Sequence, residues 1–255
     1  MLYRNRMKID ICLPVKNESA ILEINLEKLL AVFKVLLAAH NWRLVVSVNG
    51  SSDESFKIAS QIADSQPNLI ACEELALAGK GGAIKHAWRQ SKADILVFLD
   101  ADLAVKPELI NVLLEPLYKE EADLVISSRF LPDSSFTRSR SRTIISRGYM
   151  LLSRLVLRHH FSDLQCGFKA ITKKAFQKIE GQLLTDGWFF DTELVVLASQ
   201  QGLVVKELPV IWEETRRGQK KSSIKIFRDS KYFLINLGKF YWRLKNIKKK
   251  YRDNA

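Results

Sequence analysis

The sequence predicts an α/β protein built on a mostly parallel sheet flanked by helices. Three observations support this fold class. Short apolar stretches rich in Val, Ile and Leu alternate along the chain with longer stretches of helical periodicity. The 255 residues suffice to bury one large core. Polar or glycine-rich segments follow the apolar stretches, as in open sheets that bind ligands at the carboxyl ends of their strands.

The first half of the chain contains the clearest elements. The predicted strands are residues 8–15, 42–48, 68–74, 94–100 and 122–130. The predicted helices are residues 19–39, 52–65, 81–91 and 106–120. We expect Ser19 to cap the first helix and Pro107 to begin the last one. Beyond about residue 130 the pattern loosens into a basic loop, a long amphipathic stretch and short elements.

The composition predicts a folded protein of the cytoplasm. Hydrophobic residues make up 47% of the chain, which argues against intrinsic disorder. No apolar run approaches the roughly 18–20 residues that span a bilayer, and the N-terminal residues lack the features of a signal peptide. Cys12, Cys72 and Cys166 are widely spaced and match neither a zinc site nor a disulfide framework, so we expect reduced thiols.

Positive charge is concentrated at the C-terminal end. The net charge is +12, and residues 216–252 contain 14 Lys and Arg against a single acid, Asp229. The rest of the chain is therefore nearly neutral. We expect the C-terminal end to meet an anionic surface or ligand.

Two acids follow the fourth predicted strand, with one small residue between them. Asp100 and Asp102 can both reach a hard cation such as Mg²⁺ or Mn²⁺, whose remaining positions would be filled by water and phosphate oxygens. The alternative interpretation is a solvated turn at a strand end, because an acid pair of this spacing is a weak signal by itself.

Other predicted strand ends carry polar or cationic groups. Asn17 and Glu18 follow the first strand, Asp53 follows the second, and Lys80 precedes the third helix in a glycine-rich loop. That loop, AGKGGA, fits neither the P-loop nor the dinucleotide-binding spacing, and its alternative interpretation is a turn with a helix cap.

These residues together resemble a known family. Pro14 to Glu18, Asp53, Lys80 to Ala83 and Asp100 to Asp102 look like the nucleotide-sugar domain of family 2 glycosyltransferases with the Rossmann-like GT-A fold. Residues 162–176, 187–202 and 205–225 resemble the polyprenyl-phosphate hexosyltransferases, and among them the dolichyl-phosphate β-glucosyltransferases most. The resemblance covers roughly residues 8–230 in motif order.

The resemblance implies inverting transfer of a hexose from a nucleoside diphosphate sugar, expected to be UDP-glucose, to a polyprenyl phosphate. It implies that Asp102 holds Mg²⁺ or Mn²⁺, that Asp100 lies near the ion or the ribose, and that Asp191 and Arg129 also act in catalysis. The implied nucleotide-sugar-binding residues are Pro14, Val15, Asn17, Glu18, Asn49, Asp53, Lys80, Gly81, Asp100 and Ala101. An ionised acceptor phosphate needs no strong general base, which suits a chain without an evident Ser/His/Asp set.

An acceptor phosphate needs cations, and arginine suits bidentate phosphate contacts. The predicted acceptor-binding residues are Arg129, Arg138, Arg147, Arg216, Arg217, Lys220 and Lys221. The residues expected near the sugar or the acceptor are Asp163, Gln165, Gly167, Phe168, Lys169 and Glu193. The alternatives are solvated surface charges for the basic residues and helix capping for Asp163 and Asp191.

One position departs from the family pattern. Val48 stands where the second strand usually ends in an aspartate that contacts the nucleotide, so Ser47, Asn49 or Asp53 takes over that contact or the base is held differently.

The predicted domains are a catalytic domain of residues 1–225 and a basic amphipathic tail of residues 226–255. Phe233, Leu237, Phe240, Leu244 and Ile247 follow helical spacing, which fits either an anionic bilayer interface or packing on the protein's own domain. We expect a peripheral protein at the inner face of the membrane, held there by the tail or by a separate membrane subunit.

Two other functions fit the sequence. The acceptor could be a glycan rather than a lipid, or the chain could be an inactive basic protein that binds nucleic acid or a partner. The apolar face of the tail favours lipid, so we expect no nucleic acid.

Overall fold

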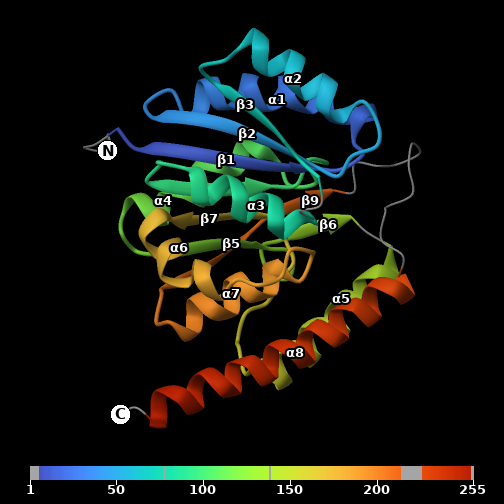
Figure 1. The fold of residues 1–255 in the computed structure, drawn as a ribbon, viewed down its shortest axis with the longest axis vertical. Helices are drawn as coiled ribbons and strands as arrows, with labels where there is room; N and C mark the ends of the chain where they lie inside the picture. The colour runs from blue at the N-terminus through green and yellow to red at the C-terminus, as the bar shows by residue number, and fades with distance from the viewer. Residues whose placement is uncertain (1–5, 77–78, 138, 214–225, 254–255) are drawn as a thin grey trace. The chain divides into compact units, whose positions relative to one another are not determined.

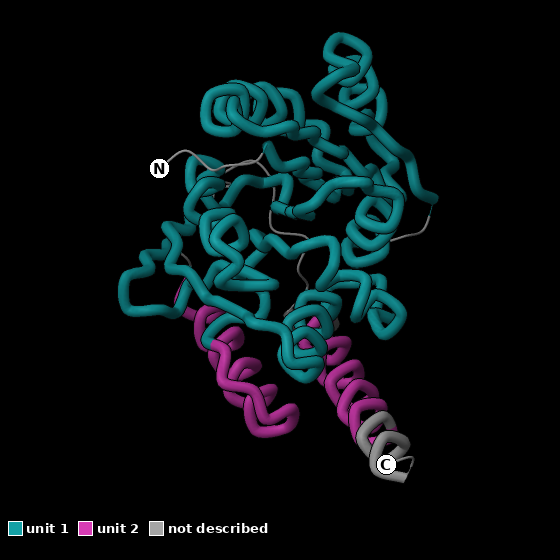
Figure 2. Tube along the Cα trace, turned by 90° about the vertical axis from the view of Figure 1, so that its left-hand side faces the viewer, with its two compact units in different colours: residues 1–137, 162–215 teal, residues 138–161, 216–255 magenta. Residues whose placement is uncertain are grey.

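The chain divides into two units, residues Met1–Thr137 with Ser162–Thr215 and residues Arg138–Phe161 with Arg216–Ala255 (Figure 2). The computed structural model describes residues 6–76, 79–137, 139–213 and 226–253. The second unit combines residues 138–161 with the C-terminal segment, and the predicted domain boundary between residues 225 and 226 stays a prediction.

A seven-stranded sheet runs through the first unit (Figure 1). In spatial order its strands are β3 (Ile70–Leu75), β2 (Asn41–Asn49), β1 (Lys8–Val15), β4 (Ile95–Leu99), β7 (Phe168–Thr172), β5 (Leu124–Ser128) and β8 (Val205–Pro209). Only β7 runs antiparallel to its neighbours, and the predicted mostly parallel sheet is confirmed. Two short strands, β6 (Ser135–Thr137) and β9 (Ile211–Glu213), pair in parallel beside it.

Helices cover both faces of this sheet. They are α1 (Ser19–Leu36), α2 (Ser55–Ser65), α3 (Gly79–Gln90), α4 (Ile110–Tyr118), α6 (Lys173–Ile179) and α7 (Phe190–Gln200), with 3₁₀ turns at Pro107–Leu109 and Glu180–Gln182. All five residues of β4 are buried, because alternate side chains point to opposite covered faces. Val97 belongs to the same core cluster as Phe33 of α1. On the other face, the Phe98 ring lies 5.9 Å from Trp88 of α3.

The direction of β7 decides where its flanking residues lie. Open α/β sheets bind ligands at the edge where the carboxyl ends of their parallel strands meet. Here these are the ends of β1, β2 and β4, and we call this edge of the sheet the site-bearing edge. Because β7 is reversed, its amino end reaches that same edge: Phe168 pairs with Leu99. The segment just before β7 therefore arrives beside Asp100.

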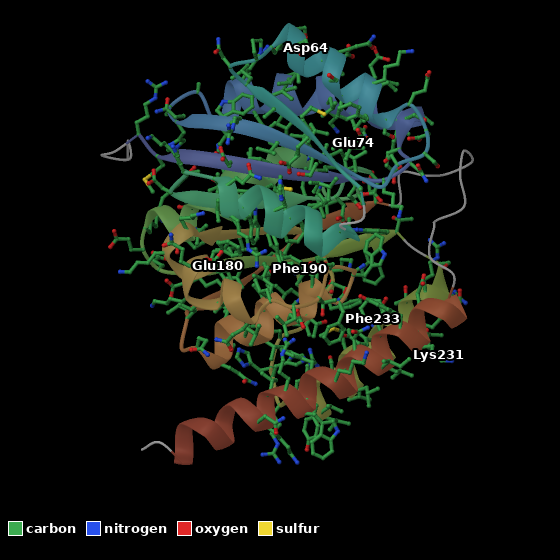
Figure 3. The ribbon with its side chains drawn as sticks, viewed as in Figure 1. Asp64, Glu74, Glu180, Phe190, Lys231 and Phe233 are labelled. Atoms are coloured by element: carbon green, nitrogen blue, oxygen red, sulfur yellow. The ribbon has the colours of Figure 1, made fainter. Side chains whose placement is uncertain are left out.

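The second unit contains α5 (Arg140–Leu157) and α8 (Ile226–Asp253). The two helices pack together, with the Tyr149 ring centroid 5.0 Å from that of Phe233, which Figure 3 labels. Leu237, Phe240 and Leu244 of the predicted apolar stripe are buried. These three side chains therefore do not form a free apolar face.

Among the described helices, none is both long and apolar enough to cross a membrane.

Candidate functional site

The loops after β1 and β2 are tied to each other at the site-bearing edge. The Asn17 N–H donates to the Ser51 hydroxyl at 3.0 Å, and the Asn17 carboxamide oxygen accepts from the Ser52 N–H at 2.7 Å. Asn17 has a φ of 56°, a conformation that asparagine tolerates better than most residues. These bonds hold the two loops as one wall.

Asp53 caps α1 from the neighbouring loop. Its carboxylate accepts from the Ser19 N–H at 3.1 Å and from the Ser55 hydroxyl at 2.6 Å. Burial alone would raise the pKa of Asp53, but hydrogen bonds from Ser55 and Ser19 lower it to about 2. The predicted cap by Ser19 is wrong, because Glu18 occupies the cap position and makes no side-chain cap bond. Asp53 thus fixes the start of α1 and its own loop through hydrogen bonds to Ser19 and Ser55.

The carboxyl end of β2 is closed by apolar and amide groups. Val48 is fully buried, so no carboxylate faces the edge from this position. The Asn49 amide donates to the Val15 carbonyl at 2.9 Å and joins β2 to β1. Pro14 and Val15 lie within β1 itself. Direct nucleotide contacts by these residues stay a prediction.

Asp100 and Asp102 follow β4 in a tightly held turn. The Asp100 N–H donates to the Gly167 carbonyl at 2.9 Å, and the Asp102 carboxylate accepts from the Ala104 N–H at 3.2 Å. The Ala101 carbonyl accepts from the Asn25 side chain of α1 at 2.8 Å. Both acids line a small hollow. The other residues lining the hollow are Leu99, Ala104, Val105, Gly167 and Trp212.

Lys80 links Asp100 to a second, buried acid. Its Nζ lies 2.9 Å from Asp100 Oδ1 and 3.0 Å from Asp191 Oδ2, while Lys169 Nζ lies 2.5 Å from Asp191 Oδ1. Burial opposes the charge on Lys80, but Asp100 and Asp191 raise its pKa above the ordinary value. Burial raises the pKa of Asp100 and the charge of Lys80 opposes that rise. Alternating charges therefore run from the edge of the sheet into its core.

Asp191 lies in the interior of the first unit. It is completely buried in the first turn of α7, and both of its oxygens accept from lysines. It caps no helix, which removes the alternative suggested by the sequence. Glu193 is also buried and accepts from the Thr185 N–H at 2.8 Å. Both acids position neighbouring groups in this structure.

Three glycines allow close approach at the site. Gly79 has a φ of 66°, and a Cβ there would lie 2.6 Å from the Asp186 carbonyl. A Cβ on Gly81 would overlap Phe190, the α7 residue labelled in Figure 3. A Cβ on Gly167 would overlap the Asp100 carboxylate. The glycine-rich loop therefore packs α3 against the segment that leads into α7.

Arg129 and Asp163 form a buried bidentate pair. Arg129 Nε and Nη2 donate to the two Asp163 oxygens at 2.6 and 2.9 Å. Burial would raise the pKa of Asp163, but Arg129 outweighs it and the pKa is lowered. The guanidinium carbon lies 5.8 Å from the centre of the Trp212 ring, which lines the hollow. Asp163 thus holds Arg129 beside the site, and neither residue caps a helix.

The other predicted residues are distributed as follows. Gln165 donates to Thr192 at 2.8 Å, and Phe168 is buried as the first residue of β7. Arg147 lies on α5 of the second unit. The remaining predicted acceptor residues, Arg138, Arg216, Arg217, Lys220 and Lys221, lie outside the described residues.

Three contacts were not anticipated from the sequence. Asn25 binds the turn between the two acids, and Trp212 lines their hollow. The centre of the Trp188 ring lies 5.3 Å from Lys80 Nζ. Trp188 and Trp212 lie in segments that resemble the family, but their side chains were not singled out, because residue spacing does not show which groups α1, β9 and the loop before α7 bring together.

The donor set at the edge suits a hard cation shared with a ligand. Within the described part of the chain, no three His, Cys, Asp or Glu residues cluster as a complete metal site. Asp100 and Asp102 can supply carboxylate oxygens, and the remaining positions of Mg²⁺ or Mn²⁺ are commonly filled by phosphate oxygens and water. The residues therefore fit a cation that binds together with a diphosphate.

Sequence comparison finds clear relatives. Residues 10–180 match the family described as Glycosyl transferase family 2. Glycosyltransferase AglD of Haloferax volcanii is 33% identical over 207 residues, which cover 81% of this chain and 33% of that protein. The dolichyl-phosphate beta-glucosyltransferase of Drosophila melanogaster is 29% identical over 259 residues, covering 96% of this chain and 79% of that protein. The dolichyl-phosphate beta-glucosyltransferase ALG5A of Trichomonas vaginalis is 28% identical, and the chain spans 65% of its length.

Solved structures share the fold. Mannosyl-3-phosphoglycerate synthase from Rubrobacter xylanophilus superposes with a TM-score of 0.70 at 15% identity, covering 94% of this chain and 75% of that one. Glucosyl-3-phosphoglycerate synthase from Mycobacterium tuberculosis, crystallised with UDP, gives a TM-score of 0.65 at 20% identity, covering 91% and 79%. The predicted GT-A architecture is confirmed at the level of the fold.

Proposed function

This chain belongs to glycosyl transferase family 2, and on that premise we propose that it transfers a hexose from a nucleoside diphosphate sugar to a polyprenyl phosphate with inversion. The observation that carries the proposal is the pair Asp100 and Asp102 at the end of β4, joined to Lys80 and facing a hollow. Acids and a buried ammonium at one strand end suit a diphosphate bound through a cation.

The donor that we propose is UDP-glucose. Relatives from Drosophila melanogaster and Trichomonas vaginalis are named dolichyl-phosphate beta-glucosyltransferases, and a protein of the same fold was crystallised with UDP. Val48 removes the acid expected at the end of β2, so Ser47, Asn49 and Asp53 are the polar groups that we propose for the nucleoside contact.

The chemistry follows from the charges at the edge. An acceptor phosphate oxygen, ionised at pH 7, forms a bond to the anomeric carbon as the bond to the donor diphosphate breaks. Asp100 and Asp102 are the residues that would hold Mg²⁺ or Mn²⁺, which would supply positive charge to offset the negative charge of the diphosphate. Lys80 lies 2.9 Å from Asp100 and adds a positive charge to the same place. Arg129, held by Asp163 and 5.8 Å from the ring of Trp212, which lines the hollow, is the cation that we propose for the incoming phosphate.

A transfer assay tests this proposal. The protein is incubated with UDP-glucose, Mn²⁺ and a polyprenyl phosphate, and the lipid is analysed by mass spectrometry. We expect a hexosyl phosphate lipid from the wild type and none from Asp102→Asn. Asp64→Asn, an equal charge change at an exposed α2 residue labelled in Figure 3, should keep full activity. Product with GDP-mannose alone would contradict the proposed donor, and transfer only to a soluble glycan would contradict the lipid acceptor.

We also propose that the protein works at the cytoplasmic surface of an anionic membrane, through the second unit. Leu151 and Leu155 of α5 and Leu234 and Trp242 of α8 are large apolar side chains exposed to solvent. Residues 216–252 add the concentrated positive charge. Each basic residue near an anionic surface contributes about 1 kcal/mol, which salt screens.

Liposome co-sedimentation tests the membrane proposal without a partner subunit. Leu155→Ser should weaken binding to phosphatidylserine liposomes. Ile24→Ser on α1 is the matched control, because both side chains are 70% exposed. Equal binding by the two variants and wild type would contradict a role for this surface. Absence of wild-type binding to protein-free liposomes would favour attachment through a separate membrane subunit.

A further inference from the structure

Trp188 is a large, partly exposed aromatic side chain beside the charged network. It is 44% exposed, and its ring centre lies 5.3 Å from Lys80 Nζ. The same ammonium lies 2.9 Å from Asp100, the acid that lines the hollow. Because Lys80 lies close to both groups, a single donor molecule bound with its diphosphate at Asp100 could also contact the indole.

The segment that carries Trp188 is anchored to α3. The Gly82 N–H donates to the Asp186 carbonyl at 2.9 Å. Lys85 Nζ binds the Leu183 carbonyl at 3.0 Å and the Asp186 carboxylate at 2.7 Å. These bonds fix the backbone on the amino side of Trp188, so the indole is held ready for a ligand rather than ordered by it.

The order of the sheet indicates which part of a donor would reach this indole. The walls formed by the β1 and β2 loops, where Asn17 and Asn49 lie, are on one side of β4. Trp188 leads into α7, whose Asp191 binds Lys169 of β7 on the other side of β4. A donor with its diphosphate at Asp100 and its nucleoside at β1 and β2 would direct its sugar toward β7 and α7.

We propose that Trp188 forms one wall of the hexose subsite and positions the sugar ring of the donor, an inference that rests on the proposed function. A hexopyranose presents C–H groups on its ring face, and these pack on the electron-rich face of an indole. The indole N–H at the edge of the ring can also donate to a hydroxyl. The contact belongs to the sugar and not to the nucleotide.

Calorimetric titration with UDP-glucose and with UDP, both in Mn²⁺, separates these two parts of the ligand. Trp188→Ala should weaken UDP-glucose binding by roughly tenfold, the scale of one aromatic contact, and leave UDP affinity within about twofold. Trp188→Phe should recover most of the loss. Leu184→Ala is the matched control, because this side chain on the same loop is 61% exposed and should change neither affinity.

Fluorescence gives a second readout that does not depend on turnover. Adding UDP-glucose to the wild type should protect one tryptophan from iodide quenching, UDP alone should not, and Trp188→Phe should abolish the protection. Equal losses for UDP and UDP-glucose in Trp188→Ala, or no loss for either, would overturn the inference. If the wild type binds UDP-glucose and only the acceptor dependence changes in Trp188→Ala, the subsite is wrong while the proposed function stands. If the wild type binds neither ligand, both fall.

Discussion

Replacing Asp191 with asparagine changes a side chain whose two oxygens both accept from lysines. Asparagine keeps the volume, so no cavity opens. Its single oxygen can serve only one of Lys80 and Lys169, and its NH₂ group would face the other ammonium. Lys80 still has Asp100 as a partner, whereas Lys169 keeps the Cys166 carbonyl but loses half of its access to a carboxylate. Removing one partner of a buried ion pair costs about 3–5 kcal/mol.

We therefore expect Asp191→Asn to be unstable. For a chain of this size, 1 kcal/mol corresponds to about 2–4 °C in Tm, so the melting temperature should fall by roughly 6–20 °C. Thermal unfolding followed by circular dichroism measures this change directly. The affinity for UDP in Mn²⁺ should fall as well, because Lys80 loses its second anchor.

A double variant tests the cause of the instability. Lys169→Met removes the cation that Asp191→Asn leaves unpaired, so Lys169→Met with Asp191→Asn should melt higher than Asp191→Asn alone. The reasoning is refuted if Asp191→Asn melts within about 2 °C of wild type while transfer is lost. That result would give Asp191 a direct role in the reaction, as the family resemblance first suggested.

Three other changes have defined outcomes. Gly167→Ala should displace the Asp100 carboxylate, because the added Cβ would overlap it. We expect a loss of about 1–3 kcal/mol in the free energy of unfolding by chemical denaturation, and weaker Mn²⁺-dependent nucleotide binding. A normal Kd for the nucleotide would contradict this expectation. Asp53→Ala should lower stability by about 1 kcal/mol at neutral pH. Since the folded pKa of Asp53 is depressed from 3.8 to about 2, this difference should shrink as pH falls through that window, and a constant difference would refute the cap. Arg129→Lys should break the bidentate pair with Asp163 and lower kcat for the lipid acceptor more than donor affinity, which steady-state kinetics can measure.

Features encoded by local sequence patterns could be predicted. The strands before Asp100 and the alternation of helices follow from periodicity, and the acids at a carboxyl strand end follow from the parallel sheet. The reversal of β7 could not be predicted, because a five-residue apolar stretch carries no sign of its direction. The cap of α1 by Asp53 was missed for a similar reason, since the two residues that it joins are 34 positions apart.

The chemistry of single residues proved harder to predict than their location. Asp191 pairs with Lys80 and Lys169, and Arg129 pairs with Asp163, which the charge pattern of the sequence did not identify. The spacing of charges along a sequence does not show which opposite charge neutralises each one. The apolar stripe of α8 shows the same limit: its periodicity predicted a helix, but not that Leu237, Phe240 and Leu244 would be buried.

The reversed strand also makes this fold open to exchange of parts. The chain leaves the edge of the sheet after Arg129 and returns to it at Asp163. The bidentate pair between these two residues joins the ends of the intervening segment. The entropy of closing such a loop grows only slowly with its length. Segments of very different length and surface could therefore be grafted between the two residues while β4, β5 and β7 keep their register. The Arg129–Asp163 pair thus marks a point at which the intervening segment could change in length while the ends of β5 and β7 stay together.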